Sequence, residues 1–329
     1  MTSEPTVQEQ LGKHFLGAWV LTSLEIASNR GLVAALAEGG TVESLADAGR
    51  VSVGVVRGLI DVFAAQGWID ASNDRVRWTD PARTALAVGA AGAFVQSDVH
   101  TTLEQHSALW RRVRDPGDAL EGWRAIDPEV VEAQARHSEA ANAMILPRVA
   151  GMLPGLAERL AQDGAAILDV GAGGAGGAIA FARMFPTVRV VGMEPSPIAL
   201  ACAERLISGA GVNGRIEMRG QLGDKLVDEN RYALAYVAQM FFPDAAWKDA
   251  AARVFRALEP GGYFITLATC RDGADLGSAV SRLRTALWGG GRRFADAIVR
   301  DLQAAGFPMA QVAPVPPGTM APVFARKGS

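Results

Sequence analysis

Cysteine is scarce in this 329-residue chain, which contains only Cys202 and Cys270. Two cysteines cannot form a disulfide framework or a four-cysteine zinc site, and their scarcity is typical of a reducing compartment. The N-terminus lacks the basic stretch and apolar run of a signal peptide. The longest run of small apolar residues, 85–95, is shorter than the roughly 20 residues that cross a bilayer. These absences predict a cytoplasmic protein with no membrane partner.

An excess of charge of one sign is also missing. The chain has 32 Lys and Arg residues against 35 Asp and Glu residues, which gives a formal net charge of -3. A protein that neutralises phosphates needs a basic surface, so this balance predicts no nucleic-acid partner. Hydrophobic residues make up 49% of the chain, which excludes intrinsic disorder because a core can be buried.

Residues 1–95 show the order of a winged-helix domain. Residues 31–37 predict a helix, and Thr41 and Ser52 stand where each would begin a further helix as its N-cap. Two short β patterns then flank a turn at 71–74. A winged helix often binds DNA, but this segment has seven basic residues against ten acidic ones. We therefore expect a dimerisation domain, because a DNA reader needs a basic face.

Residues 96–150 predict a helical linker that contributes to a substrate pocket. The linker contains three of the four histidines in the chain, His100, His106 and His137. Histidine is the most frequent general base, so each is a candidate base, with a structural role as the alternative. We expect Pro147 to end the last helix of this region, since proline interrupts a helix.

Residues 151–329 alternate short apolar strands with helices. Because buried parallel strands read as short continuous apolar runs, this pattern predicts an α/β fold with a Rossmann-like, doubly wound, mostly parallel sheet. The strand candidates are residues 166–170, 188–192, 215–218, 234–237 and 263–267.

The most informative segment for chemistry follows the first of these strands. Gly171, Gly173 and Gly176 have the spacing G-x-G-x-x-G, in which glycines let the backbone turn tightly and approach a ligand. The helix beyond them offers free N–H groups to a ligand. Glu194 ends the next strand, where a carboxylate can accept hydrogen bonds from both hydroxyls of a ribose. The segment therefore predicts a nucleotide or nucleoside site.

Asp169, two residues before the first glycine, separates two ligand classes. A dinucleotide site usually has an apolar residue here, because a carboxylate repels a pyrophosphate. A ligand with an ammonium group and a sulfonium would instead be attracted. Asp169 thus argues against an NAD-dependent oxidoreductase, which stays an alternative.

The motifs Leu168-Asp-Val-Gly-Ala-Gly-Gly, Gly192-Met-Glu and Leu258-Glu-Pro-Gly-Gly together resemble those of the class I S-adenosylmethionine-dependent methyltransferases. With the winged helix, the helical linker and the closing Ala305-Gly-Phe, nearly the whole chain is similar to the small-molecule O-methyltransferases of plant and bacterial secondary metabolism. The resemblance implies S-adenosyl-L-methionine as cofactor, a small-molecule substrate and a homodimer formed through the N-terminal domain.

The resemblance also implies residues that hold the cofactor. Asp169 and the glycine loop would surround its amino-acid end, and Glu194 would hold the ribose. Gln221 replaces the family's acidic residue at the adenine, and its side-chain carbonyl can still accept from the amino group. The implied contacts are Asp169, Gly171, Ala172, Gly173, Glu194, Pro195, Gln221, Leu222 and Tyr236.

One segment departs from the family pattern at the general base. The family has roughly Leu-His-Asp-Trp after the fourth strand, and this chain has Gln239-Met-Phe-Phe-Pro-Asp, which places Met240 at the histidine position. A thioether cannot take a proton, so we expect in-line methyl transfer without that base. The catalytic candidates are then His137, Gln239 and Met240. The substrate candidates are His100, Asn142, Met144 and Arg292, the last after a glycine run at 289–291 that we expect to be flexible.

Other functions stay open. A cofactor-bound relative could catalyse a rearrangement or cyclisation without methyl transfer, or a C- or N-methyltransferase could use a metal or a linker histidine. A ligand-sensing transcription factor would need a basic N-terminal face. We expect no metal site, because Asp244 is the only acid near the substrate motif and no histidine adjoins it.

Overall fold

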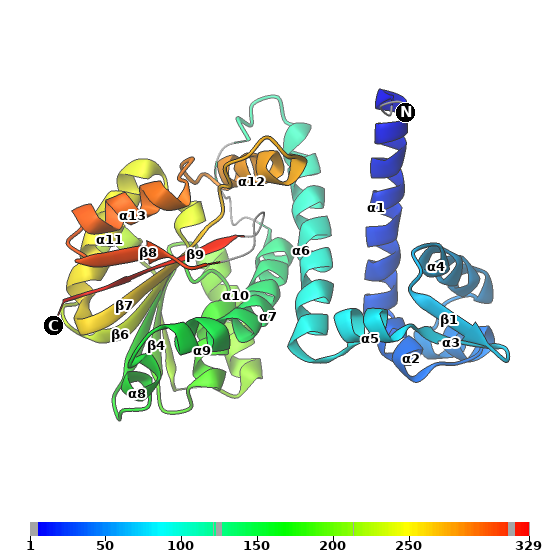
Figure 1. The fold of residues 1–329 in the computed structure, drawn as a ribbon, viewed down its shortest axis with the longest axis horizontal. Coiled ribbons are helices and arrows are strands. Elements are labelled where there is room, and N and C mark those ends of the chain that lie inside the picture. Colours follow the sequence, from blue (N-terminus) through cyan, green and yellow to red (C-terminus); the bar gives the residue numbers. More distant parts are fainter. Residues whose placement is uncertain (1–5, 121, 123–126, 213, 315–319, 329) are drawn as a thin grey trace. The chain divides into compact units, whose positions relative to one another are not determined.

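The chain folds into two compact units in the computed structural model, which describes residues 6–120, 122, 127–212, 214–314 and 320–328. The units are Met1–Ser107 and Ala108–Ser329, and their boundary falls inside helix α6, Gly89–Val113 (Figure 1). Each has a hydrophobic core of its own. The division into three functional regions at 95 and 150 stays a prediction. None of the described helices has the length and apolar character of a membrane span.

The first unit has the predicted order of helices followed by a two-stranded wing. Thr41 and Ser52 cap α3 and α4 as predicted, each accepting a hydrogen bond from the backbone N–H three residues later. Asn73 and Asp74 turn the hairpin with φ values of 49° and 60°, a conformation that these residue types tolerate. The elements are α1 Val7–Asn29, α2 Leu32–Glu38, α3 Val42–Gly49, α4 Val53–Ala65, β1 Ile69–Ser72, β2 Arg75–Trp78 and α5 Asp80–Ala87.

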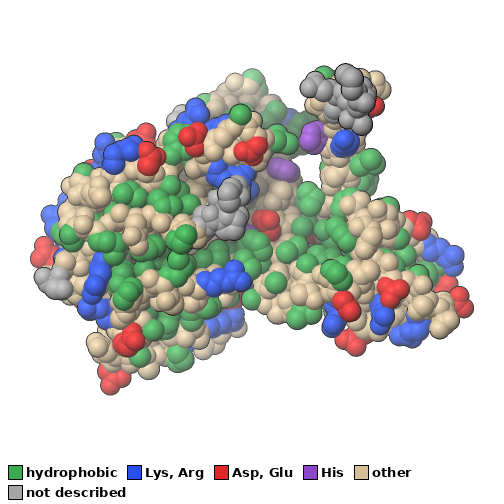
Figure 2. Space-filling model, in the orientation of Figure 1, with side chains coloured by type: hydrophobic (Ala, Val, Ile, Leu, Met, Phe, Trp, Pro, Cys, Tyr) green, Lys and Arg blue, Asp and Glu red, His purple; other side chains and the backbone are tan. Residues whose placement is uncertain are grey.

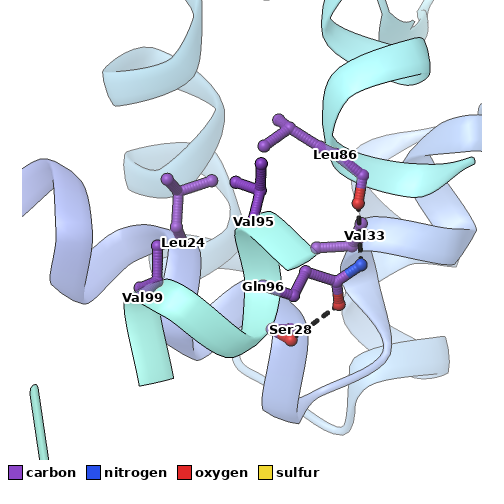
Figure 3. A pocket seen from close by; sticks show the side chains of 7 residues that line it. All are labelled: Leu24, Ser28, Val33, Leu86, Val95, Gln96 and Val99. Atoms are coloured by element: carbon purple, nitrogen blue, oxygen red, sulfur yellow. Dashed lines mark hydrogen bonds between the residues drawn. The ribbon is translucent and has the colours of Figure 1, made fainter. Parts of the chain in front are cut away.

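A small apolar pocket lies within this first unit (Figure 3). Ser28 Oγ donates to Gln96 Oε1 at 2.8 Å, and Gln96 Nε2 donates to the carbonyl of Leu86 at 2.7 Å. Because these polar side chains bond within the unit, the pocket presents mainly aliphatic surface and belongs to the packing of the unit. Its lining is Leu24, Ser28, Val33, Leu86, Val95, Gln96 and Val99.

The second unit alternates strands and helices. Its elements are α7 Pro128–Met152, α8 Leu156–Leu160, β3 Ala166–Val170, α9 Gly176–Met184, β4 Arg189–Met193, α10 Pro197–Ala210, β5 Ile216–Arg219, η1 Gly223–Lys225, β6 Tyr232–Val237, η2 Gln239–Phe241, α11 Asp244–Ala257, β7 Leu258–Ala268, α12 Leu276–Leu287, α13 Ala295–Ala304, β8 Met309–Val312 and β9 Ala321–Arg326. The prediction that Pro147 ends a helix is wrong, because α7 continues to Met152. Pro147 and Ala143, whose carbonyl loses its helical partner, are both exposed, so water can satisfy that carbonyl.

A seven-stranded sheet with the order β5-β4-β3-β6-β7-β9-β8 forms the centre of this unit. Its strands are parallel except β9, which is antiparallel to β7 and β8. Side chains alternate between the faces, so Ile167 packs with α8, α9 and α10 while Leu168 packs with α11 and α13. The predicted Rossmann-like, mostly parallel sheet is confirmed. Strand order reverses between β3 and β6, and ligands bind at such switch points beyond the carboxyl ends of strands.

Candidate functional site

Asp169 lies at the switch point, near the end of β3. It is 2% exposed and accepts a hydrogen bond from the backbone N–H of Ala178 in the first turn of α9. The pKa of Asp169 is raised to about 7, mainly by burial and also by the charge of Glu194, while the Ala178 N–H opposes both. The described groups that shift this pKa include no cation. A buried carboxyl of this kind favours a ligand that brings positive charge.

Glu194 joins the end of β4 to the glycine loop. Its Oε2 accepts from the N–H of Gly173 at 3.0 Å, and its Oε1 accepts from the N–H of Ser196 at 2.9 Å. Burial raises the pKa of Glu194, and these two N–H groups oppose the shift. The carboxylate therefore lies directly against the loop, where it can also accept hydroxyl groups of a ligand.

The glycine loop turns through left-handed conformations. Gly171 has φ of 80° and Gly173 has φ of 54°, values that other residue types adopt only with strain. The N–H groups of Gly171 and Ala172 both donate to the carbonyl of Met193, at 2.9 and 3.0 Å. No described atom lies within 4 Å of the place where a Cβ of Gly173 would stand, so the loop is open at that point.

Gly176, the third glycine of the motif, does not have the predicted role of letting the backbone approach a ligand. A Cβ on Gly176 would collide with the backbone carbonyl of Ala135, and one on Gly174 would lie 2.7 Å from the Ala135 Cβ. Both glycines therefore let α7 pack directly on the start of α9. The spacing alone does not distinguish a glycine that admits a ligand from one that admits a helix.

We expect Gly176→Ala to destabilise the protein by about 3 kcal/mol or more, because the new methyl group meets backbone that cannot rotate away. The measurement is the free energy of unfolding in denaturant. Gly209→Ala in α10 is the matched control, since no described atom lies within 4 Å of its Cβ position. The control should gain about 0.5–1 kcal/mol from higher helix propensity. Equal stability of the two variants would contradict the packing role.

Tyr236 lies beside Asp169 in the sheet. The two residues are partners in the β3–β6 register, and the Tyr236 ring is 6.1 Å from that of Phe181 in α9. Burial, and then the charge of Asp169, raise the pKa of the Tyr236 hydroxyl. Tyr236 is thus brought to the same face of the sheet as Asp169, as its predicted place in the cofactor site requires.

Three further predicted cofactor residues follow the neighbouring strands. Pro195 is an exposed residue after β4, and Gln221 and Leu222 follow β5. Gln221 is half-buried, whereas Leu222 is 51% exposed. Because β3, β4 and β5 are adjacent and parallel, all three residues lie along the carboxyl edge that carries Asp169. Their contacts with a cofactor stay a prediction.

Helix α7 presents the predicted substrate residues on two different sides. Asn142 is buried and donates to the carbonyl of Ser138 at 2.8 Å, and its Nδ2 lies 3.4 Å from the Cβ position of Gly177, next to Asp169. His137 and Met144 are seven residues apart and share a side of the helix, about 140–160° around from Asn142. The structure therefore brings Asn142 to Asp169 and directs His137 and Met144 away from the α9 contact.

The other linker histidines belong to the first unit. His100 Nδ1 is 2.6 Å from Glu25 Oε1, so this imidazole has a partner between α6 and α1. His106 is exposed. The substrate role of His100 stays a prediction, and a role for it requires that it leave or share Glu25.

The segment after β6 places the two remaining catalytic candidates inside the fold. Gln239 is 1% exposed; its Nε2 donates to the carbonyl of Leu267 at 2.9 Å, and its Oε1 accepts from Arg293 Nε at 3.1 Å. Met240 is 8% exposed. The bonded amide of Gln239 is held by the protein and not presented to a substrate, so the structure does not support its catalytic role.

Two glycines of the run before Arg292 are closely packed, which does not favour the predicted flexibility. A Cβ on Gly290 would collide with the carbonyl of Met240, and one on Gly291 would collide with the carboxylate of Asp244. Arg292 itself is exposed, 5.6 Å from the Phe294 ring, and its role with substrate stays a prediction. Gly290 and Gly291 therefore allow the α12–α13 connection to pack closely against the segment after β6.

Phe242 is a candidate that the sequence reading missed. An atom of its ring is 3.7 Å from the Cβ position of Gly171, and another is 3.2 Å from that of Gly223 in η1. The ring thus stands between two segments that carry predicted cofactor residues. The available signal was its alignment with the tryptophan of the family's Leu-His-Asp-Trp segment.

Charges of both signs are interspersed over the face of the molecule shown in Figure 2, in keeping with the balanced composition. Within the part of the chain that the structure describes, no three His, Cys, Asp or Glu side chains gather where they could hold a metal ion.

Comparisons with known proteins agree with this geometry. Residues 167–262 match the family model described as "Methyltransferase domain", a range that begins in β3 and ends in β7. It includes the glycine loop and Glu194. None of the curated proteins compared with this sequence matches it.

Solved structures match over the full length of the chain. A Nostoc punctiforme protein provisionally assigned as an O-methyltransferase has a TM-score of 0.70 at 18% identity, covering 99% of this chain and 100% of its own. The mitomycin 7-O-methyltransferase MmcR has a TM-score of 0.65 at 18% identity, with 98% of each chain covered. Human N-acetylserotonin methyltransferase, solved with S-adenosylmethionine, has a TM-score of 0.64 at 17% identity, with 100% of each chain covered. At these identities the likeness shows a shared fold.

Proposed function

We propose that this protein transfers the methyl group of S-adenosylmethionine to a small molecule, because residues 167–262 match the family model of a methyltransferase domain. The observation that carries the proposal is the buried carboxyl of Asp169 and the half-buried carboxyl of Glu194, on either side of an open glycine loop. The names of two structural neighbours, which act on mitomycin and on N-acetylserotonin, support an acceptor of small-molecule size.

The donor set of the site fits that cofactor. Asp169 offers a buried negative charge to an ammonium group, and Glu194 offers carboxylate oxygens to ribose hydroxyls. When bound, the cofactor would supply a methyl group on a sulfonium, for transfer to a lone pair of the acceptor with the C–S electrons left on sulfur. The chain's own task is to hold the acceptor atom at about 3–3.5 Å from the methyl carbon, in line with the sulfur.

We propose that the acceptor reaches the site already nucleophilic. Met240 stands at the family's base position, Gln239 is bonded within the fold, and His137 lies on the side of α7 away from the α9 contact. A phenol of low pKa, a carboxylate or a neutral amine needs little help from a base. We therefore propose methylation of oxygen or nitrogen in such a group.

Formation of S-adenosylhomocysteine tests the proposal. The protein should bind S-adenosylmethionine in calorimetry and release S-adenosylhomocysteine, detected by mass spectrometry, with a panel of acidic phenols, carboxylates and amines. Binding of the cofactor with product formation but no S-adenosylhomocysteine would favour the alternative of a rearrangement or cyclisation. Binding of NAD in place of S-adenosylmethionine would overturn the proposal.

We also propose that the protein is a homodimer formed through α1. One side of this helix exposes large apolar side chains, each between 48% and 72% exposed, and isolated soluble monomers rarely show such a continuous apolar strip. A second copy of the chain is the occupant that the family resemblance implies. The residues are Val7, Leu11, Phe15, Leu16 and Trp19.

The double substitution Phe15→Glu with Trp19→Glu should convert the dimer to a monomer. Light scattering after gel filtration should give twice 34.5 kDa for the wild type and 34.5 kDa for the variant, because two buried charges oppose the contact. Lys13→Glu, about half a turn away on the same helix, is the matched control and should stay dimeric. A wild-type protein that is monomeric at micromolar concentration would contradict the proposal.

A further inference from the structure

The connection between α12 and α13 carries a buried cation that the proposed reaction does not use. Arg293 is 5% exposed, whereas the adjacent Arg292 is exposed. Removing a guanidinium from water costs free energy unless its donors all find partners. The N–H groups of a buried arginine between α12 and α13 must therefore have hydrogen-bond partners.

Arg293 holds the segment that follows β6. Its Nε donates to Gln239 Oε1 at 3.1 Å, and its Nη2 donates to the carbonyls of Gln239 at 2.7 Å and Phe242 at 2.6 Å. Its Nη1 pairs with the carboxylate of Asp244, and the guanidinium lies 5.4 Å from the centre of the Trp247 ring. One planar side chain thus binds both ends of η2 and the first turn of α11.

The backbone between α12 and α13 also contacts the segment that follows β6. The N–H of Gly291 donates to the carbonyl of Phe242 at 3.3 Å, and Gly290 is too close to the carbonyl of Met240 for any side chain. Phe242 is therefore fixed through its carbonyl oxygen by two donors, one from the backbone of Gly291 and one from Arg293.

The ring of Phe242 reaches the glycine loop and η1. It stands within 3.7 Å of the Cβ position of Gly171 and within 3.2 Å of that of Gly223. A displacement of the Phe242 backbone would therefore move an aromatic ring at the border of the cofactor loops. A shift of about 1 Å at such a position can change binding or rate by up to a hundredfold.

We propose that Arg293 is a positioning residue, which sets the Phe242 ring against the cofactor by fixing the backbone of the segment after β6. This inference rests on the proposed function, because it names the cofactor site as the place where the ring acts. Lysine cannot replace the arginine, since an ammonium group lacks the planar fork that binds two carbonyls, an amide and a carboxylate together.

The test is the affinity for S-adenosylhomocysteine, measured by calorimetry on the full-length protein. Arg293→Lys should weaken it by about ten- to a hundredfold. Arg300→Lys, an exposed arginine of α13 that pairs with Asp296, should leave it unchanged. Phe242→Leu should weaken it by a similar factor. If Arg293 acts through this ring, the double variant should bind no more weakly than the weaker single variant, since the two changes remove one interaction.

The outcomes that overturn the inference differ from those that overturn the function. An Arg293→Lys protein that melts at a lower temperature but binds S-adenosylhomocysteine as the wild type does would show a purely structural role. Additive losses in the double variant would also refute it. If Arg293→Lys does not fold, Gly290→Ala displaces the same segment with the arginine kept, and unchanged affinity there would refute the inference. A wild-type protein that does not bind S-adenosylhomocysteine would instead refute the proposed function.

Discussion

Asp169→Asn should weaken binding of S-adenosylmethionine at neutral pH by about a hundredfold or more and remove its pH dependence. The carboxyl is 2% exposed, and its proposed partner is the ammonium group of the cofactor. Removing one partner of a buried charge pair commonly costs about 2–5 kcal/mol of binding free energy, because the other charge is left buried and unpaired. The asparagine keeps the shape and the acceptor for the Ala178 N–H, so the loss reports the charge.

The wild-type protein should bind more tightly as pH rises. Burial raises the pKa of Asp169 to about 7, so the free protein carries a neutral acid below that pH, whereas a bound cation favours the carboxylate. The affinity should then rise about tenfold per pH unit up to about pH 7 and level off above it. Calorimetry at pH 6 in two buffers of different ionisation enthalpy should report release of about 0.9 proton per cofactor. A flat pH profile in the wild type would contradict this account.

The raised pKa of Asp169 has the opposite effect on the stability of the cofactor-free protein, which should fall as pH rises. A carboxyl whose pKa is raised on folding contributes stability below its unfolded pKa of about 4, and this stability is lost as pH rises through about 7. Above pH 7 the loss amounts to about 4 kcal/mol. Asp169→Asn should therefore unfold at higher denaturant concentration than the wild type at pH 8. The difference should shrink by about 1.4 kcal/mol per unit as pH falls from 7 to 5.

Glu194→Gln should weaken cofactor binding through loss of the proposed contact with the ribose. Both carboxylate oxygens accept backbone N–H groups, from Gly173 and Ser196, so the amide NH2 of glutamine must face one of these donors. An unsatisfied buried N–H costs about 1–3 kcal/mol, and the ribose hydroxyls lose an acceptor as well. We expect the affinity for S-adenosylmethionine to fall about ten- to a hundredfold, measured by calorimetry.

Glu194→Gln should also shift the pH profile of the remaining binding. The charge of Glu194 raises the pKa of Asp169, so its removal should move the midpoint of the pH dependence to lower pH. Glu217→Gln on β5 is the matched control, because this carboxylate is exposed and pairs only at the surface with Arg219. Unchanged binding in Glu194→Gln, or an equal loss in Glu217→Gln, would argue against a ribose contact.

Local patterns in the sequence were sufficient for the fold and for the polar residues at the strand ends. Thr41 and Ser52 act as N-caps because capping depends on a few consecutive residues. Asp169 and Glu194 follow apolar strands directly, and neighbouring parallel strands bring their carboxyl ends to one edge, so their proximity was predictable. Pro147 is a local signal that misled, because an exposed proline can remain within a long helix.

The sequence by itself therefore determined the parallel sheet, the winged N-terminal unit and the glycine loop between two carboxyls. These features depend on the spacing of apolar residues and on turn-forming residues, which are close together in the chain. Only the tertiary structure decided that Gly176 admits a helix, that His137 lies away from the α9 contact, and that Arg293, not Arg292, is buried. Neighbouring arginines are alike in sequence. They differ here because Arg293 meets Gln239, 54 residues earlier, and such contacts depend on how distant segments pack.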